Sequence, residues 1–273
     1  MQTGYYQATA GMVAQFNRLD VIANNLANVN TTGFKEEKVI VGDFMRLYKE
    51  ARDKLPLENQ TKEGAKFLNR TMARVPQIVD KYTDFQEGNL EKTDNTLDVA
   101  LSRENLFFLV KTPQGLRLTR DGSFTTNEEG KLVTKQGYEV LPSNYFSGGK
   151  NIEITNTDTV VKVDKNGQIS TNIPNTFQMT PVSKLFIFQP DNPKFLKKTG
   201  DNLYMYENEA LYKPQEECGA VRQGFIEKSN VNAVEMMTQL IETNRLVGMY
   251  QKAMQTQMDE MNQDAINKIA RRA

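Results

Sequence analysis

Three aspartates are the residues whose type and spacing come closest to catalytic chemistry in this chain. Asp94 and Asp98 lie close together in the sequence, and Asp121 follows in the same turn-rich stretch. Two such carboxylates could act as the acid and the base or nucleophile of a glycoside hydrolase. The acid would need a raised pKa, from burial or from a neighbouring like charge, and the sequence shows neither. Short acids commonly cap turns and strand ends, so we interpret the three aspartates as structural.

A second group of residues could in principle bind metal. Asp164-Lys165-Asn166-Gly167 begins like a calcium loop, but an EF-hand needs a bidentate Glu at its twelfth position, which here is Asn175. The run therefore predicts a hairpin turn. The one cysteine, Cys218, follows Glu216-Glu217, which would raise its pKa, and the chain has no histidine. We predict no metal site.

Other catalytic signatures are missing from the sequence. It contains neither the phosphate-binding run G-x-x-x-x-G-K-[ST] nor the nucleophile elbow G-x-S-x-G. We therefore predict that the protein is not an enzyme, and we expect no catalytic residue, no cofactor-binding residue and no cofactor.

Composition excludes several other classes of function. The chain has 273 residues, of which 38% are hydrophobic and 25% charged, as in a globular protein. Lys plus Arg and Asp plus Glu are equal at 34 each, so nucleic acid is not an expected partner. No stretch is long and apolar enough for membrane insertion. Residues 1–11 lack the basic and apolar regions of a signal peptide, so the residues alone predict a cytosolic protein.

A helix is expected near the N-terminus, because apolar residues recur there at heptad spacing. One series repeats every seven residues and a second is offset from it by four. Together they comprise Tyr5, Thr9, Met12, Phe16, Leu19, Ala23 and Leu26. This is the a/d spacing of a helix that buries one narrow seam against another helix. The asparagines between Asn24 and Asn30, followed by Gly33, are residues that end a helix.

A second heptad series runs along the C-terminal part, with spacings that alternate three and four. It comprises Ala233, Met236, Leu240, Thr243, Val247, Tyr250, Met254, Gln257 and Met261. About four heptads are long enough to predict a coiled-coil helix. Two terminal heptad helices, with a different kind of sequence between them, are typical of an assembly protein whose ends pair and whose middle is displayed.

The region that follows the first helix is a linker or arm. Val39-Ile40-Val41 predicts a short strand, and Asp43 to Asp53 predicts a helix that Pro56 ends. Residues 58–74 are polar with scattered apolar residues, so an extended arm and a helical hairpin both stay open. We expect this region to become ordered on assembly.

Short apolar segments separated by turn residues begin at Thr83 and predict an antiparallel β-rich body. The expected strands are Leu97–Leu101, Leu106–Lys111, Leu116–Thr119, Ser123–Thr126, Leu132–Thr134, Tyr138–Leu141, Val160–Val163, Gln168–Thr171, Lys184–Phe188 and Leu203–Tyr206. Hairpin turns are expected at Thr112–Gly115, Asp121-Gly122, Glu129-Gly130 and Asn166-Gly167.

Several runs of residues resemble the flagellar rod and hook family of the bacterial basal body. The runs near the two ends are Gly11-Met12 to Phe16, Leu19 to Lys35, and Gln223 to Val234. Those in the β-rich part are Asn95 to Leu101 before Phe107-Phe108, Thr119 to Phe124, Gly130 to Thr134, and Gly137-Tyr138. The match departs at Ser102 to Asn105, where members of the family usually carry glycines.

The resemblance implies an α+β fold, in which N- and C-terminal coiled-coil helices are brought together around a central antiparallel β-rich domain. The implied parts are an inner helix at 1–34, a linker at 35–92, an outer β-rich domain at 93–222 and a coiled-coil helix at 223–273. The implied function is a structural subunit that polymerises through its terminal helices into the rod, as a helical homo- and hetero-oligomer. The implied partners are further copies, other rod and hook proteins and the flagellar type III export apparatus, which would deliver the chain to the periplasmic rod without signal cleavage.

We expect the assembly interface to lie on both terminal segments. Its candidate residues are Leu19, Ile22, Asn24, Leu26, Phe34, Asn230, Val231, Val234, Leu240 and Val247. The run Asn244 to Tyr250 differs from the Gln-Arg-Ala-Tyr-like run of distal rod proteins and favours the proximal rod, with the distal rod as the alternative. From other classes, the alternatives are a rod-associated cell-wall hydrolase and a coiled-coil adhesin or scaffold.

Overall fold

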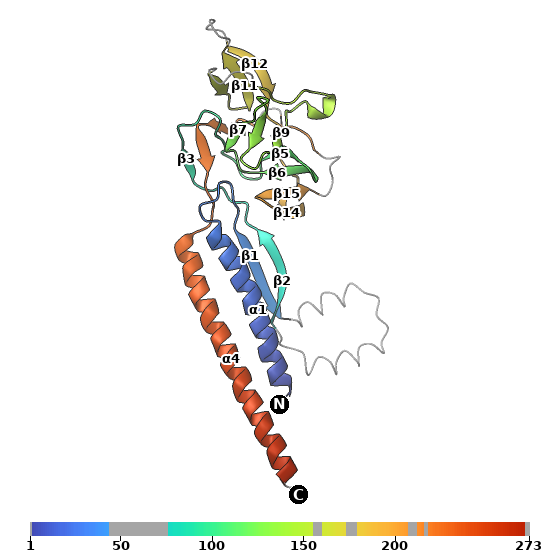
Figure 1. The fold of residues 1–273 in the computed structure, drawn as a ribbon, viewed down its shortest axis with the longest axis vertical. Helices are drawn as coiled ribbons and strands as arrows, with labels where there is room; N and C mark the ends of the chain where they lie inside the picture. The colour runs from blue at the N-terminus through green and yellow to red at the C-terminus, as the bar shows by residue number, and fades with distance from the viewer. Residues whose placement is uncertain are drawn as a thin grey trace, which may run out of the picture. The chain divides into compact units, whose positions relative to one another are not determined.

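The structure is a computed structural model that describes residues 2–43, 76–154, 160–172, 179–206, 212–215 and 218–270. These residues form two compact units, drawn in Figure 1. The helical unit combines the described parts of residues 1–27, 37–82 and 232–273, and the β-rich unit combines those of 28–36 and 83–231. The helix expected over 43–53 and the arm expected over 58–74 lie outside the described residues.

The helical unit is built on two long helices, α1 (Gln2–Ala27) and α4 (Ala233–Ala270), which lie side by side and antiparallel (Figure 1). Near one end the Thr9 hydroxyl bonds to the sulfur of Met254 over 3.3 Å, and near the other Asn25 lies 3.9 Å from the sulfur of Met236. Each terminal helix therefore packs against the other within one chain. Among the described residues, no helix combines the length and the apolar character that crossing a bilayer requires.

The heptad series predicted which face of α4 is buried. Met236, Thr243 and Val247 are buried, and the other six residues of that series are half-buried. A single partner helix explains this, because one seam at a/d spacing is what one helix covers.

The seam predicted for α1 is wrong in part. Phe16 is 44% exposed and Ala23 is also exposed. The residues that α1 buries are instead Ala8, Gly11, Ala14, Gln15, Val21, Ile22 and Asn25. The buried face is wider and rotated, because α1 contacts both α4 and the strand β1 (Glu37–Asp43). Strand β1 pairs with β2 (Pro76–Thr83), and the side chain of Asn25 bonds to the backbone N–H and C=O of Glu37.

The β-rich unit contains one large sheet and three smaller ones. The large sheet has the strand order β14-β15-β6-β5-β9-β8-β7, and β13 also pairs with β5. Its strands are β5 (Phe107–Thr112), β6 (Gly115–Thr119), β7 (Phe124–Thr126), β8 (Leu132–Thr134), β9 (Glu139–Val140), β13 (Ile187–Phe188), β14 (Leu196–Gly200) and β15 (Leu203–Tyr206). Two short 3₁₀ turns lie at Tyr145–Ser147 and Pro193–Phe195.

The smaller sheets connect distant parts of the chain. Three strands form one of them, namely β10 (Val161–Val163), β11 (Gln168–Asn172) and β12 (Met179–Lys184). The others are two pairs, β16 (Val221–Gln223) with β4 (Val99–Leu101), and β17 (Phe225–Glu227) with β3 (Leu90–Lys92). The segment that leads to α4 is thus paired with the segment that opens the β-rich unit.

Strand β5 contributes to two apolar clusters, one on each of its faces, because successive strand residues point to opposite faces. Phe107 and Leu109 join Leu118 and Tyr204 on one face. Phe108 and Val110 belong to the cluster on the other face, which also contains residues from β4, β10 and β16. Both faces of β5 are buried, as its continuous apolar run requires.

Two of the turn and strand predictions need correction. Asp121-Gly122 is not a hairpin turn, because β6 pairs with β5 and β15 while β7 pairs with β8. Gly122 is instead where the chain crosses β4, and a Cβ atom there would lie 1.6 Å from the carbonyl oxygen of Val99. The strand expected over Lys184–Phe188 is divided between the end of β12 and β13. The turn at Asn166-Gly167 is confirmed, with Gly167 donating to the carbonyl of Asp164 over 2.8 Å.

Candidate assembly interface and its buried charge cluster

Three charged side chains are buried together in the β-rich unit, and we call them the charge cluster: Lys35, Arg120 and Glu227. The ammonium of Lys35 lies 2.7 Å from Oε1 of Glu227, and Nε of Arg120 lies 2.8 Å from Oε2 of the same carboxylate. Arg120 also donates from Nη2 to Oε1 over 2.9 Å, which makes its contact bidentate. All three side chains are at most 1% exposed.

The backbone satisfies other hydrogen-bonding groups of the charge cluster. Lys35 donates to the carbonyl of Gln86, and Arg120 donates from Nη1 to the carbonyls of Arg103 and Leu106. The amide of Gly88 donates to the carboxylate of Glu227 over 2.9 Å. These bonds offset part of the large free-energy cost of removing three charges from water.

Burial and charge pairing act in opposite directions on Glu227. Burial by itself would raise the pKa of its carboxyl, but the Arg120 guanidinium and then the Lys35 ammonium hold that pKa below the usual value. Burial lowers the pKa of Lys35. The Glu227 carboxylate raises that pKa, and repulsion from Arg120 lowers it further. The Glu227 carboxylate and the Lys35 ammonium thus each favour the charged form of the other.

The charge cluster joins segments that are far apart in the sequence. Lys35 belongs to the segment after α1, Glu227 to the segment before α4, and Arg120 follows β6. Gly33 allows the close approach, since its φ is +66° and a Cβ atom there would lie 2.6 Å from the backbone of Arg120 and Asp121. Its amide donates to the carbonyl of Glu227 over 2.7 Å. Both segments that connect to the terminal helices are therefore fixed to the sheet of the β-rich unit.

Further hydrogen bonds hold the same two segments. Asn230 accepts from the amide of Glu36 over 2.8 Å and donates to the carbonyl of Asp84 over 2.9 Å. Asn202 donates to the carbonyl of Thr32 over 2.7 Å. Asn230 was predicted as an assembly residue. In the structure its side chain instead forms hydrogen bonds within one chain, to Glu36 and Asp84.

The ten predicted assembly residues differ widely in exposure. Four are buried within the chain: Ile22, Phe34, Val231 and Val247. Another four are half-buried: Leu19, Leu26, Asn230 and Leu240. Only Asn24 and Val234 of this set are exposed, and Val234 is 74% exposed. The structure thus buries eight of the ten wholly or partly within the subunit.

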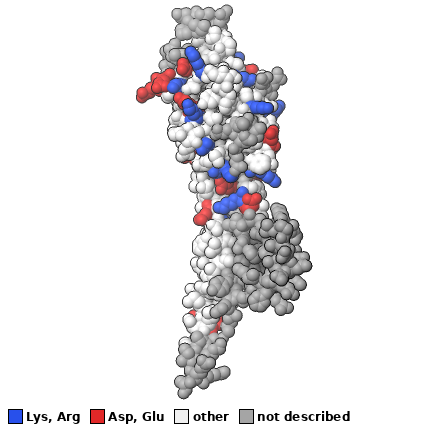
Figure 2. Space-filling model, turned by 90° about the vertical axis from the view of Figure 1, so that its right-hand side faces the viewer, with Lys and Arg blue, Asp and Glu red and all other residues white. Residues whose placement is uncertain are grey.

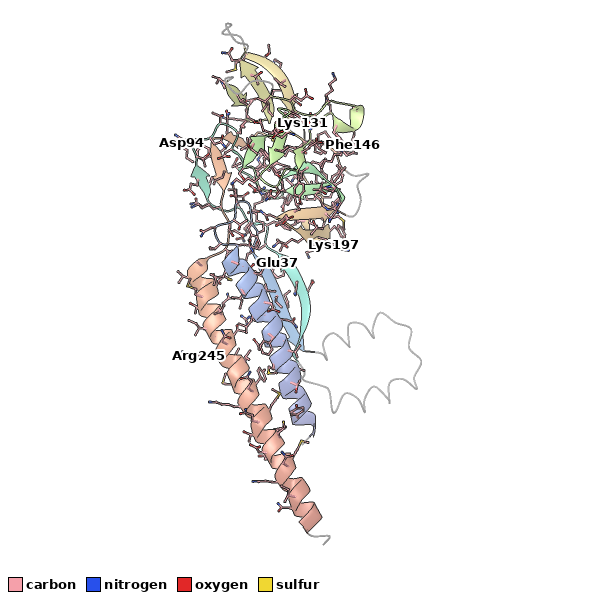
Figure 3. The ribbon with its side chains drawn as sticks, viewed as in Figure 1. Glu37, Asp94, Lys131, Phe146, Lys197 and Arg245 are labelled. Carbon is pink, nitrogen blue, oxygen red and sulfur yellow. The ribbon has the colours of Figure 1, made fainter. Side chains whose placement is uncertain are left out.

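A different set of apolar side chains on the two helices is exposed. On α4 they are Val234, Met237, Ile241, Met249, Met258 and Ile266, and on α1 they are Val13 and Phe16. Val234, Met237 and Ile241 follow one another at helical spacing, so they form a continuous stripe at the start of α4. The charged Arg245, farther along α4, is also exposed (Figure 3). Of the stripe, only Val234 was among the predicted assembly residues; Met237 and Ile241 were missed because each helix was assigned a single seam.

Helix α4 is longer than its partner. Since Thr9 lies opposite Met254 and the helices are antiparallel, α1 begins near Met261, whereas α4 continues to Ala270. The last turns of α4, including the exposed Ile266, have no residue of α1 beside them.

Two of the three aspartates considered for catalysis, Asp98 and Asp121, are engaged in local structure. Asp94 is exposed on the β-rich unit (Figure 3), and Asp98 accepts from Asn95 over 3.0 Å. Burial raises the pKa of Asp121, and hydrogen bonds from the amide and hydroxyl of Ser123 oppose this increase. Within the described ranges, no group of three or more acidic, cysteine or histidine residues could hold a metal ion.

Three family models match the chain. Residues 6–35 match the flagella basal body rod protein family, and residues 105–171 match the D1 domain of the flagellar hook protein FlgE/F/G. Residues 222–268 match the C-terminal region of the flagellar basal body rod FlgEFG protein. These matches cover most of α1, strands β5 to β9 of the large sheet, and most of α4.

Known proteins match over almost the whole chain. The flagellar basal-body rod protein FlgG of Buchnera aphidicola (subsp. Acyrthosiphon pisum) is 33% identical over 93% of this chain and 94% of its own length. FlgF of Caulobacter vibrioides, also a flagellar basal-body rod protein, is 32% identical over 99% of each chain. The flagellar hook-basal body complex protein FlhP of Bacillus subtilis is 29% identical over 84% of this chain.

Proposed function

The chain belongs to the family of flagellar basal-body rod proteins and is a structural subunit of the rod, and we propose that it polymerises through α1 and α4 into the axial shaft. This family is structural, not enzymatic. The paired helices would form the inner layer of the shaft, and the β-rich unit would lie outside them. The partners would be further copies of the chain and other rod and hook proteins.

The exposed apolar stripe carries this proposal. The α1–α4 pair already buries one face of α4 within the chain, yet Val234, Met237 and Ile241 still face solvent. Full burial of a large apolar side chain contributes about 1.5–3 kcal/mol. A neighbouring helix pair would cover these side chains, and it would also cover Phe16 on α1.

The extra length of α4 supports contacts between subunits that build an open filament and not a closed ring. The last turns of α4 bear the exposed Ile266 beyond the N-terminal end of α1, and the stripe lies at the opposite end of the same helix. A contact between two different surfaces of one subunit is heterologous, and it produces a helical filament when its rotation does not close a ring.

Charge inserted into the stripe tests the proposal. The double variant Val234→Asp with Ile241→Asp should be almost absent from purified basal bodies of cells that lack the unaltered chain, as immunoblotting would show. The matched control is Ala253→Asp with Thr256→Asp, because both residues are exposed on α4 and lie outside the stripe. Basal bodies that contain the stripe variant at the level of the unaltered chain would refute polymerisation through this surface.

The position within the rod is part of the same proposal. The run Asn244 to Tyr250 supports the proximal rod, and the distal rod is the alternative. Cross-linking from Arg245, an exposed position on α4, in purified basal bodies would identify the neighbouring proteins by mass spectrometry. Cross-links to distal subunits on both sides would refute the proximal position.

Delivery by the flagellar type III export apparatus, without signal cleavage, is the route we propose to the periplasmic rod. Cells with an inactive export apparatus should retain the chain in the cytoplasm at unchanged mass. Recovery of a shortened chain from the periplasm of those cells would contradict this route.

A further inference from the structure

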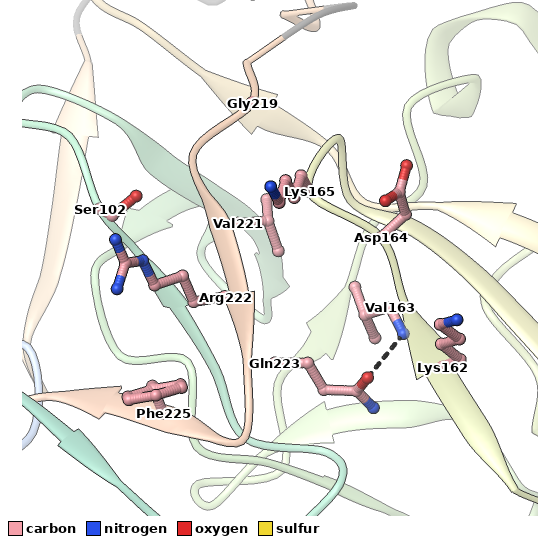
Figure 4. Close-up of a pocket in the computed structure, with 10 residues that line it drawn as sticks. All are labelled: Ser102, Lys162, Val163, Asp164, Lys165, Gly219, Val221, Arg222, Gln223 and Phe225. Carbon is pink, nitrogen blue, oxygen red and sulfur yellow. Dashed lines mark hydrogen bonds between the residues drawn. The ribbon is translucent and has the colours of Figure 1, made fainter.

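A groove of about 530 Å³ in the β-rich unit has a basic rim, and we call it the basic groove (Figure 4). The cations on its rim are Lys162 and Lys165 of the β10–β11 hairpin and Arg222 of β16, and all three are exposed. Asp164 is the one acid among the lining residues. In the part of the chain that the structure describes, none of the three cations has an ion-pair partner.

The walls of the basic groove are fixed by hydrogen bonds. Gln223 accepts from the amide of Val163 over 3.0 Å, drawn in Figure 4, and it donates to the carbonyls of Thr96 and Val161. On the opposite wall, Ser102 bonds through its hydroxyl to the carbonyl of Ala220 over 2.9 Å. The three cations are therefore presented on a rigid frame, which reduces the entropy that a bound partner would have to remove.

A second surface of the same unit is acidic. Glutamates gather around Lys131 at the turn between β7 and β8, and we call this set the acidic patch: Glu128, Glu129, Glu139 and Glu153. Lys131 makes ion pairs with Glu129 and Glu139, over 2.8 and 3.3 Å, and its backbone bridges to that of Glu153. The ammonium thus pairs with two of the four carboxylates. Figure 2 shows acidic side chains projecting from the edge of this unit.

The turn that carries the acidic patch is also rigid. The side chain of Asn127 accepts from the amides of Glu129 and Lys131, and Gly130 donates to the carbonyl of Asn127. Glu128 and Glu153 are exposed, and among the described residues neither has an ion-pair partner. No ion pair joins the acidic patch to the basic groove within the described chain.

We propose that the basic groove of one copy binds the acidic patch of the next copy, which makes a lateral contact between β-rich units. This inference rests on the proposed polymerisation, and it names a second contact in addition to the helices. Opposite charges on two rigid surfaces of one chain are complementary between copies, and such pairs fix register as well as adding affinity. Because the two surfaces differ, the contact is heterologous and can repeat along a filament.

Charge reversal on each surface, followed by their combination, tests the contact. Lys162→Glu with Arg222→Glu should lower the amount of chain in purified basal bodies about tenfold, because like charges would then face each other. Glu128→Lys with Glu153→Lys should have a similar effect, while the ion pairs of Lys131 are left in place. All four substitutions in one chain restore opposite charges, so incorporation should return to at least about half of the unaltered level.

The matched control reverses two exposed lysines outside both surfaces, Lys194→Glu with Lys213→Glu, and incorporation should not change. Circular dichroism of each full-length variant checks its folding. If Lys162→Glu with Arg222→Glu is destabilised, Lys162→Gln with Arg222→Gln replaces it and should give a smaller loss of incorporation. Normal incorporation of both reversed pairs, or no recovery in the combined variant, would overturn the inference. The stripe variant on α4 reports on polymerisation separately, so the two proposals can fail independently.

Discussion

The carboxylate of Glu227 lies 2.7 Å from the ammonium of Lys35, although the two residues are separated by most of the chain. One precedes α4 and the other follows α1, so a single ion pair joins the two segments that connect to the terminal helices. Arg120 attaches the same carboxylate to the large sheet. The charge cluster therefore sets where both segments leave the β-rich unit.

Removal of the shared anion should be strongly destabilising. Glu227→Gln leaves the cations of Lys35 and Arg120 buried together without a counter-charge, and breaking a buried pair costs about 3–5 kcal/mol. Urea unfolding followed by circular dichroism would measure the loss. The exposed Glu104→Gln is the control, expected to change the free energy of unfolding by less than about 0.5 kcal/mol. Equal unfolding midpoints for the two variants would show that the cluster contributes little.

The same carboxylate predicts how stability depends on pH. The pKa of Glu227 is held below its usual 4.5 in the folded chain, so its contribution is present above that pH and is lost as pH falls through the folded pKa. The difference in unfolding free energy between the unaltered chain and Glu227→Gln should therefore shrink below about pH 4.5. Burial raises the pKa of Asp121, so Asp121→Asn should give the opposite trend: the stability associated with that carboxyl is lost as pH rises through its raised folded pKa. A constant difference for Glu227→Gln down to acid unfolding would contradict the assignment.

Gly33 should tolerate substitution less well than another glycine whose φ angle is also positive. Gly33→Ala combines a positive φ with a Cβ atom 2.6 Å from backbone atoms of Arg120 and Asp121, which are not free to move. Gly148→Ala is the control, because its φ is also positive but nothing lies within 4 Å. The control should cost about 1–2 kcal/mol of unfolding free energy, and Gly33→Ala clearly more. Thermal unfolding of both variants measures the difference, and equal costs would mean that the contact with Arg120 relaxes freely.

The charge cluster shows what a single sequence does not reveal. Lys35 and Arg120 each stand beside other charged residues, as Glu36 and Asp121, and such runs are usually solvated. Burial of these charges depends on partners more than a hundred residues away, so no local pattern could predict it. The one local sign of this packing is Gly33. A glycine is compatible with a close approach of another backbone segment, but it does not identify that segment.

Helix faces and strands were predictable where a single partner decides which residues are buried. The heptad series identified the buried face of α4, because that helix packs on a single helix. It failed at Phe16 because α1 also contacts β1, and two neighbours make a wider buried face than one seam. Strands β3, β16 and β17 were missed for a related reason, since each has three residues and pairs with a distant segment. The hairpin strands β5 and β6 were found from their turn.

The closeness of α1 and α4 leads to a final prediction. A Cβ atom on Gly11 would lie 2.6 Å from the ring of Tyr250, so Gly11→Leu must displace that ring. Gly248→Ala, on the other helix, meets nothing within 4 Å and should raise stability by about 0.5–1 kcal/mol, because alanine favours helix. Helical circular dichroism during thermal unfolding should therefore show a lower midpoint for the first variant and a higher one for the second. Addition of Tyr250→Ala to Gly11→Leu should recover part of the loss, because the space left by the ring accommodates leucine. No recovery would mean that Gly11 is needed for a reason other than its contact with Tyr250.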